Sequence, residues 1–305
     1  MSHLTQARGF NAVVMMEGMG MLAWILLLVS ALCGQDFTDL RIEKLAGNFR
    51  FTDGPVWSKE GFLLFSDVPN NRVVKWTPGI GLQTYRENSA GASGHAFDAQ
   101  GRLISCETRN RRLVRKTKDG WEVLADRFEG KRLNAPNDVV VRRDGHIYFT
   151  DPAFGEQLDR RELDFFGVYH ISPKGELEVI AKPKGRPNGV ALSPNGRILY
   201  VSNSDERAVY AYDLDGAGRA SQERLLLTGI DGPPAGIRTD EKGNLWVACN
   251  QLAVYSSQGK LLKTIELAET PRNCAFGDAD FQTLYVTAMT SVYRVRLNVK
   301  GAIPY

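Results

Sequence analysis

Several features that mark common protein classes are scarce or absent in this sequence. It has four cysteines in 305 residues and no Cys-x-x-Cys pair, which argues against a disulfide framework and a structural zinc site. Its formal net charge of +3 is too small to predict nucleic acid or an anionic surface as a partner. Beyond residue 36 no stretch shows sustained apolar periodicity of 3.6 residues, so helices should be minor. These absences favour a globular, strand-rich protein.

A long apolar run occurs at the N-terminus. The 13 residues from Met21 to Cys33 carry no charge. That length is too short for an ordinary membrane-spanning helix and typical of the apolar region of a signal peptide. Small residues at Ala31 and Gly34 fit a cleavage site. We predict that residues 1–34 are a signal peptide and that the protein is exported, to a periplasm or outside the cell; an uncleaved membrane anchor is the alternative.

The cysteines beyond this leader are Cys106, Cys249 and Cys274. Their odd number and wide spacing do not indicate disulfide pairs. Cys106 and Cys249 lie in apolar strand-like runs, RLISC and LWVAC, so we interpret them as buried structural thiols.

A local basic cluster follows the first of these two apolar runs, RLISC. It consists of Arg109, Arg111, Arg112, Arg115 and Lys116. Because the cluster coincides with an expected strand and its flanks, we interpret it as a solvated edge and not as a binding patch.

The stretch from Asn134 to Gly155, NAPNDVVVRRDGHIYFTDPAFG, reveals how the chain is organised. A β-branched run at 139–141 and a second strand-like run at 147–150 flank a tight polar turn, Arg142 to Gly145. This pattern predicts an antiparallel hairpin. The side chains with coordinating chemistry, Asn134, Asn137 and Asp138, stand where its first strand begins; we expect Asn134 and Asp138 to support the loop and turn.

Variants of this unit recur six times. Equivalent positions are spaced 38 to 51 residues apart, which predicts a six-bladed β-propeller in the all-β class. In the third copy we expect the segment 167–175 to be the outer strand. The residues before Asp53 would add the strand that closes the ring with the sixth copy, so that 36–305 form a single domain. The six equivalent positions are Gly54, Gly94, Asp138, Gly189, Gly236 and Cys274.

In such a ring, the residues that begin the innermost strands converge at one mouth of the central channel. They supply one carboxylate and several amides but no histidine or cysteine, a donor set that suits Ca²⁺, Mg²⁺ or Mn²⁺. A divalent ion there could polarise a carbonyl group in an acyl-transfer reaction. The converging positions are Asp53, the region of Ser93, Asn137, Asn188, Ala235 and Asn273.

Asparagine and aspartate before a strand also cap turns, which is the structural alternative for each of these residues taken singly. The matched positions of Asn137 and Asn188 in neighbouring repeats favour a functional role for that pair. We predict Asp53, Asn137 and Asn188 as metal ligands, and Asn137 and Asn273 as substrate contacts.

Several motifs resemble one known family. They are GPVW with LLFSDVPNNRVVKW, KRLNAPNDVVVRRDGHIYFTDPAFG, RPNGVALSPNGRILYVSNS, GNLWVAC, and NCAFG with TLYVTA. Together they resemble the senescence marker protein/gluconolactonase/luciferin-regenerating enzyme family of six-bladed propellers, over roughly residues 53–297. The bacterial gluconolactonase-like members are the most similar, and diisopropyl fluorophosphatase is similar too.

The resemblance implies a divalent ion, usually calcium or zinc, held by a Glu, two Asn and an Asp from four repeats. The two Asn positions fall on Asn137 and Asn188, both intact. The Glu position falls on Asp53, whose side chain is shorter by one methylene, about 1.5 Å. The Asp position, where the family places a metal ligand and presumed base or nucleophile, falls on Ala235. Calcium is the expected ion, with zinc or magnesium as alternatives.

With Ala235 at this position, one carboxylate and two amides remain, and a lower charge predicts weaker metal binding. The catalytic residue is therefore undetermined from sequence. Asp53 and His95 are weak candidates, with His95 interpreted as a loop residue, and Asp231 is interpreted as a turn former.

The leading hypothesis is a metal-dependent hydrolase that opens a sugar lactone, acting as a monomer and without nucleic acid. The alternative, motivated by Ala235, is a catalytically degenerate propeller that binds a small molecule or a partner. A third possibility keeps hydrolysis but changes the substrate, for example to a phosphotriester.

Overall fold

Twenty-six strands and one short 3₁₀ helix make up the computed structural model over its described residues, 37 and 40–303. The chain divides into two units, Met1–Thr38 and Asp39–Tyr305. The predicted signal peptide, residues 1–34, lies outside the described residues. Within the described part, no helix is both long and apolar enough to cross a membrane.

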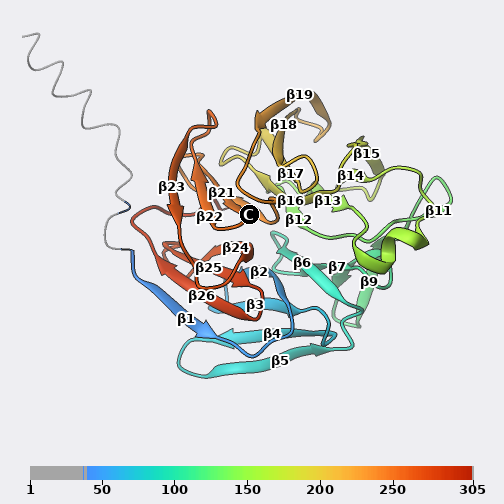
Figure 1. Ribbon diagram of the computed structural model, residues 1–305. Helices are drawn as coiled ribbons and strands as arrows, with labels where there is room; N and C mark the ends of the chain where they lie inside the picture. The colour runs from blue at the N-terminus through green and yellow to red at the C-terminus, as the bar shows by residue number, and fades with distance from the viewer. Residues whose placement is uncertain (1–36, 38–39, 304–305) are drawn as a thin grey trace, which may run out of the picture. The chain divides into compact units, whose positions relative to one another are not determined.

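Six antiparallel four-stranded sheets, the blades, surround a central axis (Figure 1). The first three blades contain β2 (Thr52–Ser58), β3 (Phe62–Asp67), β4 (Arg72–Thr77) and β5 (Gly81–Glu87); β6 (Ala92–Phe97), β7 (Leu103–Glu107), β8 (Arg112–Lys116) and β9 (Trp121–Ala125); and β12 (Val139–Val141), β13 (Ile147–Asp151), β14 (Gly167–Ile171) and β15 (Leu177–Ala181). A small hairpin of β10 (Arg127–Phe128) and β11 (Lys131–Arg132) lies between the second and third blades in sequence, and the helix η1 (Gly155–Arg160) follows β13.

The other three blades complete the ring. They contain β16 (Pro187–Leu192), β17 (Ile198–Asn203), β18 (Ala208–Leu214) and β19 (Ala220–Leu227); β20 (Ile237–Thr239), β21 (Leu245–Ala248), β22 (Leu252–Tyr255) and β23 (Leu261–Ile265); and β24 (Pro271–Gly277), β25 (Thr283–Ala288), β26 (Ser291–Arg296) and β1 (Ile42–Ala46). The predicted six-bladed propeller is therefore confirmed.

The ring closes by sharing the sixth blade between the two ends of the chain. Strand β1 is the outermost strand of that blade and pairs antiparallel with β26, with Ile42 opposite Val295. This satisfies an edge that would otherwise present unpaired backbone groups. The closing strand expected before Asp53 is thus present.

The third blade matches the predicted hairpin but differs at its outer edge. Val139 pairs with Phe149 as expected, and β13 continues one residue further, to Asp151. The expectation that residues 167–175 form the outer strand is wrong. β14 ends at Ile171, a turn closed by Gly175 N–H to Ser172 O (2.8 Å) follows, and β15 is the outer strand. The half-exposed residues of β15 gave little apolar signal in the sequence.

The core lies between the faces of neighbouring blades. One apolar cluster joins Ile104 and Leu113 of the second blade to Phe149 and Tyr169 of the third. Similar clusters join the third blade to the fourth, the fourth to the fifth, and the sixth to the first. Since each blade buries both faces against its neighbours, the positions of the innermost strands are fixed by the whole ring.

Near the axis the innermost strands approach so closely that glycine is required. Gly94 donates its N–H to Asn137 O (2.7 Å), and a Cβ on Gly94 would lie 2.6 Å from the same oxygen. Gly189 donates to Ala235 O (3.1 Å) in the same way. These bonds cross from blade to blade and hold the residues just before each glycine at fixed distances around the mouth.

Gly54 is the most constrained of these glycines. Its φ is +56°, and a Cβ would lie 1.9 Å from Ser93 O, which belongs to the backbone. We expect Gly54→Ala to lower the free energy of unfolding by about 3 kcal/mol or more, because the strain of a positive φ adds to the clash with the Ser93 backbone. The midpoint of thermal unfolding should fall by about 10 °C.

The control is Gly61→Ala, at φ +85° with nothing within 4 Å of the added Cβ. It incurs the left-handed strain alone, about 1–2 kcal/mol. Equal losses of thermal stability in the two variants would contradict the close approach of the inner strands.

Candidate functional site

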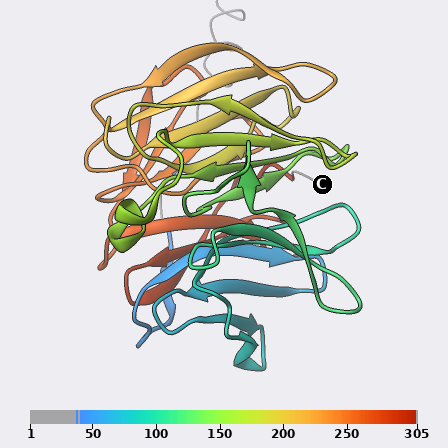
Figure 2. The ribbon, with the colours of Figure 1, turned by 90° about the vertical axis from the view of Figure 1, so that its right-hand side faces the viewer.

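A pocket of about 470 Å³ opens at one mouth of the channel. Of the six positions expected to converge there, five line it: Asp53, Ser93, Asn137, Asn188 and Ala235. The helix η1 contributes Gly155, Glu156 and Gln157 to the rim. The face carrying η1 is toward the viewer in Figure 1 and on the left side of Figure 2.

Asp53 is the carboxylate at the floor of this pocket. It is 9% exposed, and its oxygens accept hydrogen bonds from Gly54 N–H (2.7 Å) and Ser93 Oγ (3.0 Å). Burial, and secondarily the negative charge of Asp138, raise its pKa above the ordinary value of 3.8. Within residues 40–303 no arginine, lysine or histidine forms an ion pair with it, and the Arg238 guanidinium interacts with its charge only at longer range.

The two asparagines present amides with free hydrogen-bonding capacity. The backbone of Asn137 is held by its N–H to Thr150 O (2.9 Å) and by the bond from Gly94, whereas its side chain has no protein partner in the described part of the chain. Asn188 donates Nδ2 to Ser204 Oγ (3.1 Å), which leaves its Oδ1 without a partner there. The local fold thus fixes the backbone of Asn137 and the amide of Asn188 while leaving oxygens available to a ligand.

Ala235 and Asn273 complete the circle differently. Ala235 lines the pocket, and its backbone is fully engaged: its N–H donates to Ala248 O (2.8 Å), and its O accepts from Ser202 Oγ (2.6 Å). Asn273 is 2% exposed, its Oδ1 accepts Cys274 N–H (2.9 Å), and its side chain hydrogen-bonds Asp53. The structure therefore places Asn273 behind Asp53 and not among the residues lining the pocket.

The weak catalytic candidate His95 is not at the mouth. The interpretation of His95 as a loop residue is wrong, because it lies in strand β6. Its Nε2 is 2.8 Å from Ser66 Oγ, and its Nδ1 is 2.8 Å from Ser105 Oγ. Burial, with Arg86 as the second cause, lowers the pKa of His95 to about 3. Both ring nitrogens are thus occupied on a neutral, buried ring, which lines a different cavity.

Asp231 keeps the loop role expected for it. It is exposed, its Oδ1 accepts Asn250 Nδ2 (3.0 Å), and it is not among the pocket residues. It therefore does not replace the carboxylate missing at Ala235.

Asp138 has a larger role than the turn support expected from sequence. It occupies the position that is glycine in four of the other blades, so its side chain reaches toward the axis. There it pairs with Arg238 of β20, Nη1 to Oδ2 at 3.1 Å, and both side chains are largely buried. This pair lies inside the channel, below Asp53.

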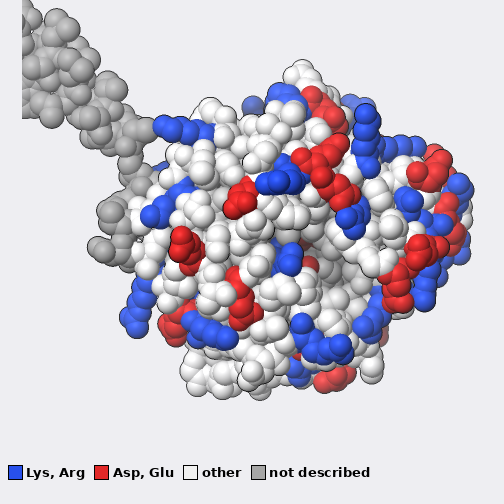
Figure 3. Space-filling view, viewed as in Figure 1, with Lys and Arg blue, Asp and Glu red and all other residues white. Residues whose placement is uncertain are grey.

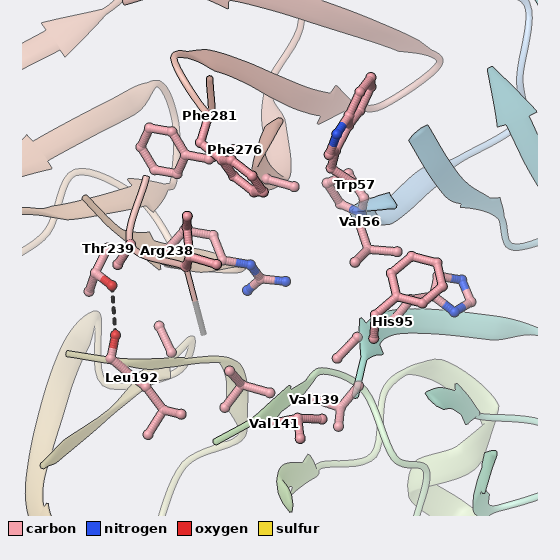
Figure 4. A pocket seen from close by; sticks show the side chains of 18 of the residues that line it. Val56, Trp57, His95, Val139, Val141, Leu192, Arg238, Thr239, Phe276 and Phe281 are labelled. Atoms are coloured by element: carbon pink, nitrogen blue, oxygen red, sulfur yellow. Dashed lines mark hydrogen bonds between the residues drawn. The ribbon is translucent and has the colours of Figure 1, made fainter. Parts of the chain in front are cut away.

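Beyond that pair lies a second, smaller cavity of about 80 Å³. Figure 4 shows the Arg238 guanidinium pointing into it among apolar side chains that include Val56, Leu192 and Phe276. The guanidinium also donates to Val190 O (3.3 Å) and Ile237 O (2.7 Å). The guanidinium thus already has hydrogen-bond acceptors within the protein.

The basic cluster from the sequence does not form one solvated edge. Arg112 pairs with Glu107, and Arg115 with Glu122. Arg111 is buried and donates Nε to Leu133 O (2.6 Å). Arg109 lines the pocket at the mouth.

Arg272 is a further pocket residue that the sequence reasoning missed. A signal existed: in the three preceding copies the equivalent residue is proline, namely Pro136, Pro187 and Pro234, whereas the sixth copy has arginine.

Cys106, Cys249 and Cys274 are all free and buried, as expected for structural thiols.

No group of three or more His, Cys, Asp or Glu residues clusters as a metal site within the described residues. Any cation at the mouth would therefore depend on amide oxygens as well as on Asp53.

Comparisons with known proteins identify a family and several relatives for this chain. The model of the SMP-30/Gluconolactonase/LRE-like region matches residues 51–290. A gluconolactonase of Zymomonas mobilis is 33% identical over 293 residues, covering 85% of this chain and 82% of that protein.

Solved structures give the same result for the fold. A gluconolactonase from Xanthomonas campestris is 33% identical with a TM-score of 0.81, covering 88% of this chain and 92% of that one. A regucalcin from Agrobacterium tumefaciens, described as a calcium-binding protein, is 16% identical with a TM-score of 0.70, covering 85% and 95%; at that identity the likeness is one of fold alone.

Proposed function

Because the chain belongs to the SMP-30/gluconolactonase/LRE-like family, we propose that it is a metal-dependent hydrolase that opens a sugar lactone at the channel mouth. One observation carries this proposal. Oxygen-bearing side chains from three blades, Asp53, Asn137 and Asn188, meet in one pocket, and the buried carboxylate among them has no cationic partner in residues 40–303. Such a donor set fits a hard divalent cation, with calcium as the first choice and magnesium or zinc as alternatives.

Asp53, Asn137 and Asn188 would hold the ion. Once bound, it would supply Lewis-acid polarisation of the lactone carbonyl and a more acidic water. In the overall reaction, water adds to the carbonyl carbon, the ring C–O bond breaks, and a hydroxycarboxylate and a proton are released.

The chain's own residues have separate tasks. The unpaired amide of Asn137 can bind the lactone or its ring hydroxyls, and Asn273 keeps Asp53 in place from behind. Among the described pocket residues, Glu156 is the other carboxylate besides Asp53, and it stands on η1 as a group able to accept the proton of water. Its ion pair with Arg160 (3.5 Å) is exposed and weak, so it does not fix Glu156 in place.

Removal of metal tests this proposal directly. After treatment with a chelator, we expect glucono-1,5-lactone hydrolysis to fall by about a hundredfold or more, to the spontaneous rate. Adding back calcium should restore it in proportion to the bound ion measured by elemental analysis. Hydrolysis that persists in metal-free protein would contradict the role assigned to the three oxygen ligands.

The second candidate function is binding without turnover, and Ala235 is the observation that favours it. With alanine at this position, the pocket lacks the second buried carboxylate that could act as a base or ligand. In that case calcium and the lactone would both bind, measured by calorimetry, while the hydrolysis rate with full metal loading would equal the spontaneous rate.

A further inference from the structure

Two arginines of the pocket have no carboxylate partner. Arg109 and Arg272 both line it, and neither forms an ion pair within residues 40–303. The carboxylates among the described pocket residues are Asp53 and Glu156, and Glu156 pairs with Arg160. Figure 3 shows basic atoms at the central hollow of this face. The two guanidinium groups thus remain available to an anion that enters the pocket.

Arg272 is held in position by weak acceptors. Its guanidinium donates from Nε and Nη2 to Met289 Sδ (3.3 and 3.2 Å) and lies 5.6 Å from the centre of the Phe51 ring. A thioether sulfur is a weak acceptor, so most of the hydrogen-bonding capacity of this half-buried cation is unused. Its backbone is fixed by the bond from Gly236 N–H to Arg272 O (2.8 Å).

Arg109 is anchored although it is exposed. Its N–H donates to Ala90 O (3.0 Å), and its Nη2 donates to Pro69 O (3.2 Å). Its aliphatic stem lies against Gly91, where an added Cβ would be 2.8 Å from its Cγ. These contacts give the long side chain a defined direction and reduce the entropy lost when it binds a ligand.

Both guanidinium groups lie beside the first blade. Pro69, which holds Arg109, is in the loop between β3 and β4, and Phe51, beneath Arg272, immediately precedes β2. The acidic residue Glu156 comes instead from the third blade. The two guanidinium groups thus define an arginine side of the pocket, which also holds Asp53 of β2 and is separate from the amides of Asn137 and Asn188.

We infer that the pocket takes a lactone that carries a second, anionic group, a carboxylate or a phosphate, which binds between Arg109 and Arg272. This specificity rests on the proposed lactone hydrolysis and adds the substrate class to it. Guanidinium groups suit both anions because they offer paired N–H donors. The alanine at position 235 contributes to this preference, since it removes a negative charge that would repel such a substrate.

A matched pair of substrates tests the inference. D-glucaro-1,4-lactone and D-glucono-1,4-lactone share the ring and differ in a carboxylate against a hydroxymethyl group. We expect kcat/KM to be about tenfold or more higher for the glucaro-lactone, mainly through KM, and the advantage to shrink with added salt.

Substitution of each arginine should remove the preference. In Arg272→Gln and in Arg109→Gln the ratio of the two kcat/KM values should fall by about tenfold, and Arg272→Lys should retain part of it. The control is Arg115→Gln, which removes an arginine that pairs with Glu122 outside the pocket (2.8 Å) and should leave the ratio unchanged.

Binding without turnover separates this inference from the proposed function. If neither lactone is hydrolysed, calorimetry with glucarate, 6-phosphogluconate and gluconate still measures the preference. Tighter binding of glucarate or of 6-phosphogluconate than of gluconate, lost in Arg272→Gln, would support the arginine side while the hydrolase proposal fails. The tighter of the two ligands identifies carboxylate or phosphate as the preferred second group. Equal binding of all three, or equal kcat/KM for the two lactones, would overturn the inference.

Discussion

In an Asp53→Asn variant we expect calcium affinity to fall by about a hundredfold and kcat/KM for a sugar lactone by about a thousandfold at fixed calcium. The substitution removes the one buried carboxylate of the pocket while keeping its shape. Asparagine can still accept the N–H of Gly54 (2.7 Å in the parent), so the backbone need not move. Calcium titration by calorimetry and steady-state kinetics measure the two effects.

The pH dependence provides an independent check of the same residue. Folding raises the pKa of Asp53 above 3.8 because burial and Asp138 disfavour its charge. Calcium requires the charged form, so the affinity of the parent should be full above this raised pKa and fall as pH is lowered through it. Asp53→Asn should remove this part of the pH dependence.

Without calcium, the sign for stability is the reverse. A carboxylate whose pKa is raised in the folded state destabilises the protein as pH rises from 3.8 through the raised value. Calcium-free Asp53→Asn should therefore unfold at the same temperature as the parent or higher at neutral pH.

The control is Asp98→Asn, which removes a buried carboxylate that pairs with Arg102 (2.7 Å) away from the pocket. It should lower stability and leave calcium affinity unchanged. A stability loss in Asp53→Asn with calcium affinity retained would show that Asp53 is structural.

The sequence predicted the ring and its mouth because both follow from periodicity. Six copies of one strand pattern give the number of blades, and equivalent positions in six copies must lie at the same height on the axis. That argument brought Asp53, Asn137 and Asn188 into one pocket although 135 positions separate the first from the last. It needed no knowledge of any side-chain contact.

What periodicity could not predict were contacts made by residues that break the repeat. Asp138 replaces a glycine in one copy, and its partner Arg238 is 100 residues away in a copy of its own. Arg272 replaces a proline in one copy, and its direction is set by Met289 and Phe51, which are distant in sequence. The burial of His95 also depends on such contacts, because Ser66 of β3 and Ser105 of β7 hydrogen-bond its two ring nitrogens.

In an Ala235→Asp variant we expect calcium to bind about tenfold to a hundredfold more tightly, because a second carboxylate joins Asp53 at the mouth. The position accepts the change: Ala235 lines the pocket, and its N–H and O are bonded to Ala248 and to Ser202 and Gly189. In the absence of calcium the two carboxylates repel each other, which raises the pKa of Asp53 further and lowers stability. Calcium should therefore raise the unfolding temperature more in the variant than in the parent.

The matched control is Ala235→Asn, which adds nearly the same volume without charge. If both variants bind calcium equally, space and not charge limits the site, and the expectation is wrong.

The activity of Ala235→Asp separates the two proposed functions. Turnover that appears only in this variant identifies the parent as a binding protein, whereas a rise of about tenfold over an active parent supports a hydrolase limited by weak metal binding. The same carboxylate should oppose Arg109 and Arg272, so the preference for glucaro- over glucono-lactone should shrink in this variant even as calcium binding improves. A single substitution that moves metal affinity and substrate charge preference in opposite directions would link the missing aspartate to the choice of an anionic lactone.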